Sequence, residues 1–212
     1  MRPYEKDPAT IYAQSFSTVR AEAQLERFDP GMAALAIRLI HACGMVEVAD
    51  RIAFSPEAAV RGRAAMQAGA PVLCDCEMVS AGIIRRALPS ENKIVVTLNE
   101  PTVPDLAKGL GTTRSAAAVE LWHDQIEGAV VAIGNAPTAL FHLLEKLDEG
   151  WPKPAVILGF PVGFVGAAES KAELSGNPRG CDFVALRGRR GGSAIASAAV
   201  NALAAGLPGE PS

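Results

Sequence analysis

Three stretches near the N-terminus repeat apolar residues at the spacing of an amphipathic helix. Each begins with a capping side chain followed by proline at the first helical position, at Asp7, Asp29 and Ser55. The second helix is predicted to end at Gly44 and the third near Gly69. The apolar positions of the first two helices are Tyr12, Phe16, Val19, Ala23, Met32, Leu35, Leu39 and Ile40.

From residue 72 onward the pattern changes to short apolar runs that alternate with helical stretches. The runs, typical of buried strands, are residues 72–74, 94–98, 129–133, 155–158 and 183–186. The helices predicted between and after them are residues 113–127, 137–149, 167–174 and 193–205. Such alternation favours right-handed crossovers and a parallel sheet covered on both faces. We therefore predict an α/β fold: a three-layer, doubly wound, mainly parallel sheet of about five strands with an N-terminal helical extension.

Size and composition narrow the class of protein. The 212 residues, 49% of them hydrophobic, suffice for a substantial core, and we expect a single domain over residues 1–212. A net charge of -3 and 5% aromatic residues argue against a nucleic-acid partner, which calls for a basic surface or stacking rings. No apolar run approaches the roughly 20 residues of a membrane helix, and the first residues lack the apolar centre of a signal peptide. We expect a soluble, cytoplasmic protein without a membrane partner.

The four cysteines form no recognisable metal or disulfide pattern. Cys74 and Cys76 are separated by one residue, too close for the usual zinc knuckle, and His41 is not in a ligand pattern with them. Nothing else in the sequence indicates an oxidising compartment. Reduced thiols and no bound metal are therefore expected.

Three glycine-rich loops follow predicted strands, at residues 134–140, 159–166 and 187–193. In an open parallel sheet, ligands bind outside the carboxyl ends of the strands. Helix N-termini offer free N–H groups there, so these loops and their arginines suit an extended anionic ligand. The alternative, that the glycines only permit tight turns, is about as strong for any one loop. No loop carries a Walker motif or a dinucleotide fingerprint, so a nucleotide is not specifically indicated.

Two side chains are candidates for chemistry. Arg114, followed by Ser115, starts a predicted helix, where arginine opposes the dipole; this favours a bidentate carboxylate contact over a solvated surface role. His41 lies in the last turn of a predicted helix, where the dipole favours the imidazolium and so a proton donor near neutral pH. On spacing alone a lone histidine is more often structural. We interpret His123 and His142 as surface or structural side chains.

Six blocks stand out along the chain, and several of them are too long and irregular to recur by chance. They are YAQSFSTVR (12–20), RLIHACG (38–44), TRSAAA (113–118), GNAPTA (134–139), GFPVGFVGAAESK (159–171) and RGRRGGS (187–193). In this order, and over nearly the whole chain, they resemble the precorrin-8X methylmutase family. These isomerases of cobalamin biosynthesis move a methyl group between adjacent ring carbons of a corrinoid precursor.

The resemblance implies an activity and a set of site residues. His41 would be the catalytic residue, protonating the macrocycle and promoting a sigmatropic methyl shift from ring position eleven to twelve that gives hydrogenobyrinic acid. The resemblance also implies no organic cofactor, and a homodimer with the active site near the subunit interface. A polycarboxylate tetrapyrrole fits the arginines and glycine loops noted above. The substrate contacts that the match implies are Ser15, Arg20, Arg38, Arg114, Ser115 and Asn135; Arg20 alternatively braces its helix.

Three alternatives stay open at the level of the sequence. The family divides into an aerobic branch with a metal-free ring and an anaerobic branch, the cobalt-precorrin-8 methylmutases; the N-terminal segment resembles the aerobic branch more. Ile84 stands where the family leads us to expect a polar contact. A corrinoid-binding or carrier protein would keep the fold without turnover, although a pure binder needs no proton donor such as His41. A nucleotide-dependent enzyme rests on the glycine loops alone.

Overall fold

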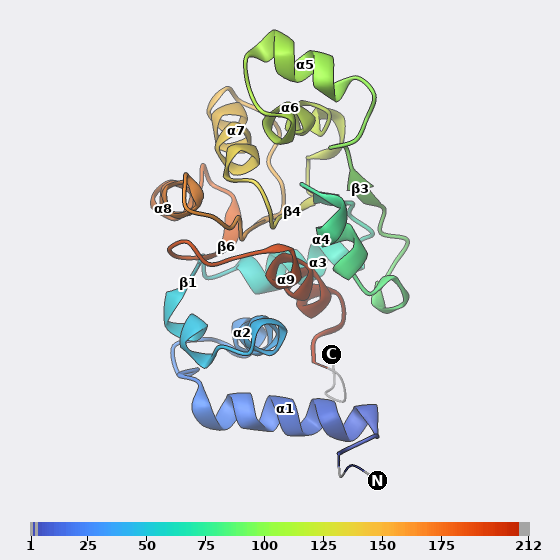
Figure 1. Ribbon diagram of the computed structural model, residues 1–212, viewed down its shortest axis with the longest axis vertical. Coiled ribbons are helices and arrows are strands. Elements are labelled where there is room, and N and C mark those ends of the chain that lie inside the picture. Colours follow the sequence, from blue (N-terminus) through green and yellow to red (C-terminus); the bar gives the residue numbers. More distant parts are fainter. Residues whose placement is uncertain (1, 3, 208–212) are drawn as a thin grey trace.

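The computed structural model describes residue 2 and residues 4–207, which fold around one six-stranded sheet (Figure 1). The strand order is β1-β6-β5-β4-β2-β3, and all neighbouring strands are parallel except β1 and β6. The strands are β1 (Ile52–Phe54), β2 (Val72–Cys74), β3 (Ile94–Val96), β4 (Val130–Ile133), β5 (Val156–Gly159) and β6 (Asp182–Leu186). The predicted α/β class and mainly parallel sheet are confirmed, with six strands instead of about five.

The additional strand is β1, at one edge of the sheet. It has three residues and runs antiparallel to β6, with Ile52 opposite Leu186. A run of three residues is too short to show an alternation of apolar and polar positions, and its partner strand, β6, lies far away in the sequence. The pairing is therefore a long-range interaction that the local pattern does not encode.

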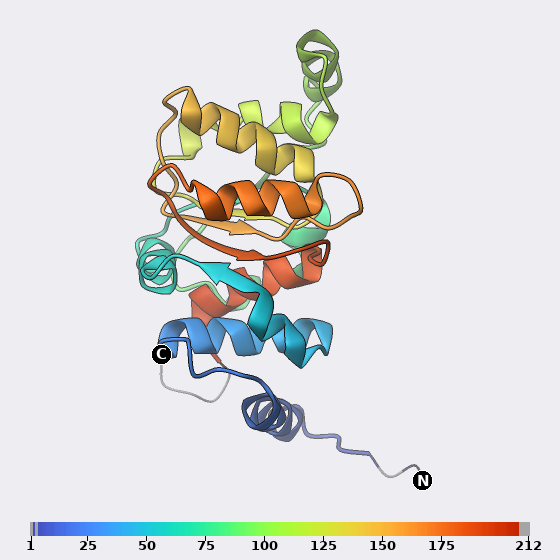
Figure 2. The same ribbon diagram turned by 90° about the vertical axis from the view of Figure 1, so that its left-hand side faces the viewer.

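Helices cover both faces of the sheet (Figures 1 and 2). One face carries α3 (Ala58–Gln67), α4 (Glu77–Gly82) and α9 (Ser193–Ala205), and the other carries α6 (Arg114–Glu120), α7 (Pro137–Asp148) and α8 (Ala167–Gly176). Successive residues of β4 enter opposite cores, Val130 and Ala132 on the α9 side and Val131 and Ile133 on the α7 side. Burial on both faces explains why the strands are apolar throughout.

Several helix boundaries differ from the prediction. Helix α3 begins at Ala58 because the residues after Ser55 form a turn, and the helix predicted over residues 113–127 ends at Glu120. A short 3-10 helix, η3 (His123–Gln125), follows it. Helices α4 and α5 (Val103–Leu110) were not predicted, since each spans at most two turns or so. The remaining 3-10 helices in the described residues are η1 (Val46–Arg51) and η2 (Arg85–Ala87).

The predicted N-terminal extension consists of α1 (Pro8–Glu22) and α2 (Pro30–Cys43). Helix α2 packs on α9 and α3, and α1 packs on the outer side of α2 (Figure 2). The N-caps predicted at Asp7 and Asp29 are confirmed, whereas Ser55 does not cap α3: Asp7 accepts from the N–H of Thr10, and Asp29 accepts from two N–H groups of its own helix. No helix in the described part of the chain, including the 15-residue α1, is long and apolar enough to cross a membrane.

The strand order locates the place where a ligand is expected. The chain builds the parallel sheet outward from β2, first to β3 on one side and then through β4, β5 and β6 on the other. The connections therefore change direction between β2 and β4. In open α/β sheets, ligands bind in the crevice outside the carboxyl ends of the strands at such a switch point.

Two glycines allow α9 to approach this part of the sheet closely. A Cβ atom on Gly134, directly after β4, would lie 2.8 Å from the Cα of Ser193 and 2.8 Å from the Cβ of Ala196. A Cβ on Gly82, the last residue of α4, would lie 2.7 Å from the Cβ of Ser197. Real Cβ atoms do not come this close, so both contacts require glycine.

We predict opposite effects on stability for two helical glycine-to-alanine substitutions. Gly82→Ala should lower the free energy of unfolding by about 1–3 kcal/mol, because the methyl group overpacks the contact with α9. Gly109→Ala in α5 should raise it by up to about 1 kcal/mol, since nothing lies within 4 Å of the new Cβ and alanine favours the helix. Urea denaturation of both variants measures the difference. Equal midpoints would contradict the close packing of α4 on α9.

Candidate active site

The carboxylate of Asp75, directly after β2, lies at the switch point and binds the backbone of the loop that follows β4. Its oxygens accept hydrogen bonds of 2.9, 2.9 and 2.8 Å from the N–H groups of Gly134, Asn135 and Ala136. These are the groups before α7 that the glycine-rich loop was predicted to offer to an anionic ligand, so for this loop the prediction is wrong. An internal anion already occupies the donors. Burial raises the pKa of Asp75, and the three hydrogen bonds oppose that rise.

A cavity of ≈ 530 Å³ lies next to this point, between the N-terminal helices and α9. Two of the predicted site residues, Arg38 and His41, line it from α2, about one helical turn apart. Tyr12 of α1 and Met78 of α4 form other parts of the wall. Ser193, at the start of α9, also lines the cavity and packs closely against Gly134 in the loop that follows β4.

The imidazole of His41 is held by side chains of α1. Its Nδ1 lies 2.8 Å from the Oγ of Ser15, another predicted site residue. The ring centroid lies 5.3 Å from that of Tyr12 and 5.2 Å from that of Phe16, the latter in an edge-on arrangement. These contacts fix the orientation of the ring, and in the described part of the chain Nε2 has no hydrogen-bond partner.

Electrostatics at His41 differ from the expectation based on the helix dipole. Burial lowers the pKa of His41, and the neighbouring positive charge of Arg38 lowers it further. The imidazole of the free protein is therefore mostly neutral at pH 7. A bound anion that neutralises Arg38 would shift the balance back toward the imidazolium.

Arg38 is a buried cation, 7% exposed. Its Nε donates a 2.9 Å hydrogen bond to the carbonyl oxygen of Gly206, directly after α9. No other hydrogen bond from its guanidinium to the described residues is present. The remaining N–H groups are available to an anionic group in the cavity, for which a planar guanidinium offers bidentate geometry.

Arg114 and Ser115 lie elsewhere, at the start of α6. Arg114 is exposed, and its guanidinium donates to the carbonyl oxygen of Leu98 at 3.1 Å and to the side chain of Asn99 at 3.0 Å. Ser115 is half-buried. Neither residue lines the cavity that holds His41.

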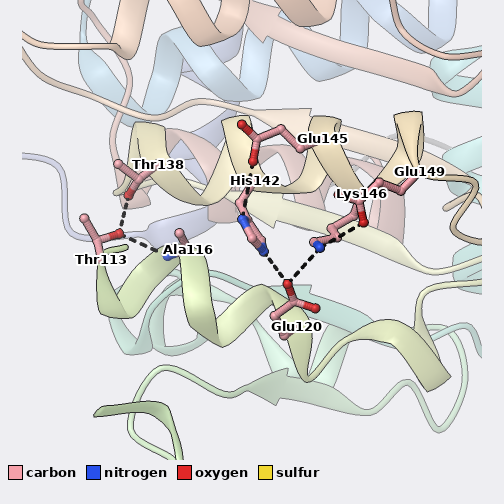
Figure 3. A network of polar contacts seen from close by, with 8 residues as sticks. All are labelled: Thr113, Ala116, Glu120, Thr138, His142, Glu145, Lys146 and Glu149. Atoms are coloured by element: carbon pink, nitrogen blue, oxygen red, sulfur yellow. Dashed lines mark hydrogen bonds and ion pairs between the residues drawn. The ribbon is translucent and has the colours of Figure 1, made fainter. Parts of the chain in front are cut away.

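Asn135 lies in the loop between β4 and α7. It is half-buried and follows β4, immediately before α7. The hydroxyl of Thr113 at the start of α6 donates a 2.8 Å hydrogen bond to that of Thr138 in α7, which joins the first turns of both helices (Figure 3). Arg20 lies exposed on α1, away from this group. The structure thus brings together Ser15, Arg38 and His41, whereas Arg114, Ser115 and Asn135 lie outside that cavity, near the starts of α6 and α7.

His142 has a structural position, as interpreted from the sequence. Its Nε2 lies 2.7 Å from Glu120, which also receives Lys146 at 3.1 Å, so α7 is joined to α6 by one shared carboxylate (Figure 3). Although burial opposes it, these hydrogen bonds lower the pKa of Glu120. The network holds in place the helix that carries Arg114.

The thiols have the properties of buried structural groups. All four cysteines are free, and burial raises the pKa of Cys76 and of Cys181, the latter to about 11. Within residues 2 and 4–207, no group of three or more His, Cys, Asp or Glu side chains could hold a metal ion.

Sequence reasoning missed three contributors to this region. Asp75 follows a predicted strand directly, and this signal for a position at the switch point was not used in the prediction. Tyr12 was assigned to an apolar stripe; it packs against the core as predicted and also lines the cavity, which was not predicted. Lys171 ends the block of residues 159–171 that resembles the family, yet its complete burial has no signal in the local sequence.

The fold and the site define an α/β protein in which an imidazole, that of His41, and a buried guanidinium, that of Arg38, face one cavity near the switch point. The family model described as "Precorrin-8X methylmutase" matches residues 10–205. A precorrin-8X methylmutase of Pseudomonas aeruginosa is 60% identical over 204 residues, which are 96% of this chain and 98% of the relative. A cobalt-precorrin-8 methylmutase of Priestia megaterium is 34% identical over 95% of this chain and 89% of the relative.

A solved structure agrees with these relatives. The precorrin-8X methylmutase of Thermus thermophilus superimposes with a TM-score of 0.81 at 35% identity, covering 92% of this chain and 95% of that one. The chain therefore belongs to the precorrin-8X methylmutase family of cobalamin biosynthesis and is an isomerase, an intramolecular methyltransferase.

We predict that Asp75→Asn will lower the free energy of unfolding by about 1–3 kcal/mol, because an amide has one acceptor oxygen where the carboxylate has two. At least one of the three buried N–H groups would lose its partner. Chemical denaturation measures the loss, and Asp105→Asn, on α5, is a matched control that should stay within about 0.5 kcal/mol. An unchanged Asp75→Asn variant would mean that the loop does not depend on this carboxylate.

Proposed function

We propose that the chain converts precorrin-8X into hydrogenobyrinic acid by moving one methyl group from ring position eleven to position twelve. The observation that carries the proposal is the position of His41, which faces a cavity beside the buried cation Arg38. The 60% identity to a relative named for the same substrate supports it.

The cavity has features suited to a large ring that bears carboxylates. Its Arg38 end offers N–H donors to a carboxylate, while Met78 and Ile84 offer apolar surface to the ring itself. Ile84 therefore contributes apolar contact where the family pattern led us to expect a polar one. An intramolecular shift needs no nucleophile and no redox group in the wall.

The proposed role of His41 is to hold and donate a proton. With Nδ1 on the hydroxyl of Ser15, Nε2 is the atom that would meet a nitrogen of the macrocycle. Substrate carboxylates beside Arg38 would offset its charge and raise the pKa of His41 in the complex. Binding and protonation are then coupled, so the imidazolium forms where it is used.

The remaining substrate contacts are proposed to lie outside the cavity that holds His41. Arg114, Ser115 and Asn135 would bind peripheral carboxylates of a ring whose other side lies at His41, and Arg20 would add a contact from α1 or brace that helix. We also propose a homodimer with the active site near the interface. The outward position of α1, which carries Ser15, supports an interface at that end of the molecule (Figure 2).

The metal-free ring is the proposed substrate. Identity is 60% to the relative named for precorrin-8X and 34% to the one named for the cobalt-bearing ring. A carrier that only holds the ring is disfavoured, because it would have no use for an oriented imidazole in the cavity.

We expect the purified protein to convert metal-free precorrin-8X to hydrogenobyrinic acid, followed by the change in absorbance that accompanies the altered conjugation. The same assay with cobalt-precorrin-8 is the comparison, and slower turnover is expected there. If the protein converts cobalt-precorrin-8 but not precorrin-8X, it is an enzyme of the anaerobic branch. Binding of both rings without turnover would favour a carrier.

His41→Ala should lower kcat at least about 100-fold, because the proton donor is lost, while hydrogenobyrinic acid still binds. The matched control is His123→Ala, since His123 pairs with Asp124 far from the cavity and should leave kcat nearly unchanged. Steady-state kinetics and a binding titration give both quantities. Near-normal turnover by His41→Ala would exclude the acid-base role.

A further inference from the structure

Lys171 of α8 is a charged side chain that the proposed chemistry does not use. It is fully buried, at 0% exposure. Its Nζ donates to the carbonyl oxygens of Pro161 at 2.9 Å and Arg190 at 2.5 Å. Among the described residues no carboxylate lies within ion-pair distance of it. A buried ammonium without a counter-ion is costly, so packing alone does not account for a lysine here.

The two carbonyl groups belong to different loops. Pro161 lies in the loop after β5 (residues 160–166), and Arg190 lies in the loop after β6 (residues 187–192). Backbone hydrogen bonds also join these loops, from Gly163 to Arg189 at 3.2 Å and from Gly192 to Phe160 at 2.8 Å. Lys171 is the side chain that ties both loops to α8.

The loop after β6 leads directly into the wall of the cavity. Three residues after Arg190 the chain enters α9, whose first residues, Ser193 and Ala194, line the cavity that holds His41. The guanidinium of Arg190 donates a 2.7 Å hydrogen bond to Glu47 in η1, the short helix that follows α2 in the chain. The backbone that Lys171 holds thus continues directly into the α9 wall of the cavity.

We propose that Lys171 is a positioning residue for the tetrapyrrole site, which holds the loops after β5 and β6 so that the start of α9 forms one wall of the cavity. This role rests on the proposed function, because the ring that would bind against the start of α9 is the corrinoid substrate. Burial lowers the pKa of Lys171 to about 8, so the group remains mainly an ammonium at neutral pH, with N–H groups for both carbonyls.

The test is Lys171→Met, which keeps the length of the side chain and removes its donors. We expect the dissociation constant for hydrogenobyrinic acid and the KM for precorrin-8X to rise about tenfold or more, with kcat within about threefold, since His41 stays on α2. Lys108→Met is the matched control; Lys108 is exposed in the last turn of α5, outside the cavity, and both constants should stay near wild type. A Lys171→Met variant that loses thermal stability but keeps both constants would overturn the proposal.

A second variant covers the case in which Lys171→Met does not fold. Gly191→Ala leaves the lysine in place but puts a Cβ 2.6 Å from the carbonyl oxygen of Pro161, forcing the same two loops apart. It should give the same rise in both constants. Unchanged constants in a folded Gly191→Ala protein would overturn the proposal as well.

Hydrogen exchange separates this proposal from the proposed function. In Lys171→Met, or in Gly191→Ala if the first variant does not fold, the amides of Gly163 and Gly192 should exchange faster than in wild type, whether or not the protein turns over a tetrapyrrole. A wild type that neither binds nor converts the ring would refute the proposed function. Unchanged exchange at these amides would refute the positioning role.

Discussion

The close packing of α9 between the sheet and α2 is the constraint on which the rest of the structure depends. The helix is composed mostly of small side chains, and nine of its thirteen residues are buried. Contacts that exclude even one methyl group fix it against Gly82 and Gly134. The first turns of α9 line the cavity, and the carbonyl group just after its end receives Arg38. A displacement of this one helix would therefore change both the shape and the charge of the site.

At the switch point of this parallel sheet, a side chain of the protein occupies part of the place where a ligand is expected. The N–H groups after β4 bind a carboxylate of the chain itself, so this loop is a rigid support and does not present its backbone donors to a ligand. The candidate acid-base residue comes instead from α2, outside the doubly wound unit. The N-terminal extension is thus part of the site, and the sheet mainly determines where α9 stands.

The sequence predicted those features whose signals are local. Capping residues gave the starts of α1 and α2, and apolar runs gave five of six strands. Strand β1 was missed because its pairing with β6 is long-range, and the burial of Lys171 because it depends on two loops that are distant in sequence. The resemblance gave the family, and the structure places Ser15, Arg38 and His41 together. The pKa direction at His41 was not predictable, because it depends on burial and on a neighbouring charge.

The attachment of α1 has a consequence for dynamics. This helix packs mainly on α2 and contributes little to the central core, yet it supplies the hydroxyl and the aromatic rings that orient the imidazole. Segments with few buried contacts open locally at a lower free energy than the whole domain unfolds. The geometry around His41 can therefore be lost by undocking of one terminal helix while the sheet remains fully folded, so the melting temperature of the domain is not a measure of the temperature at which this geometry is lost.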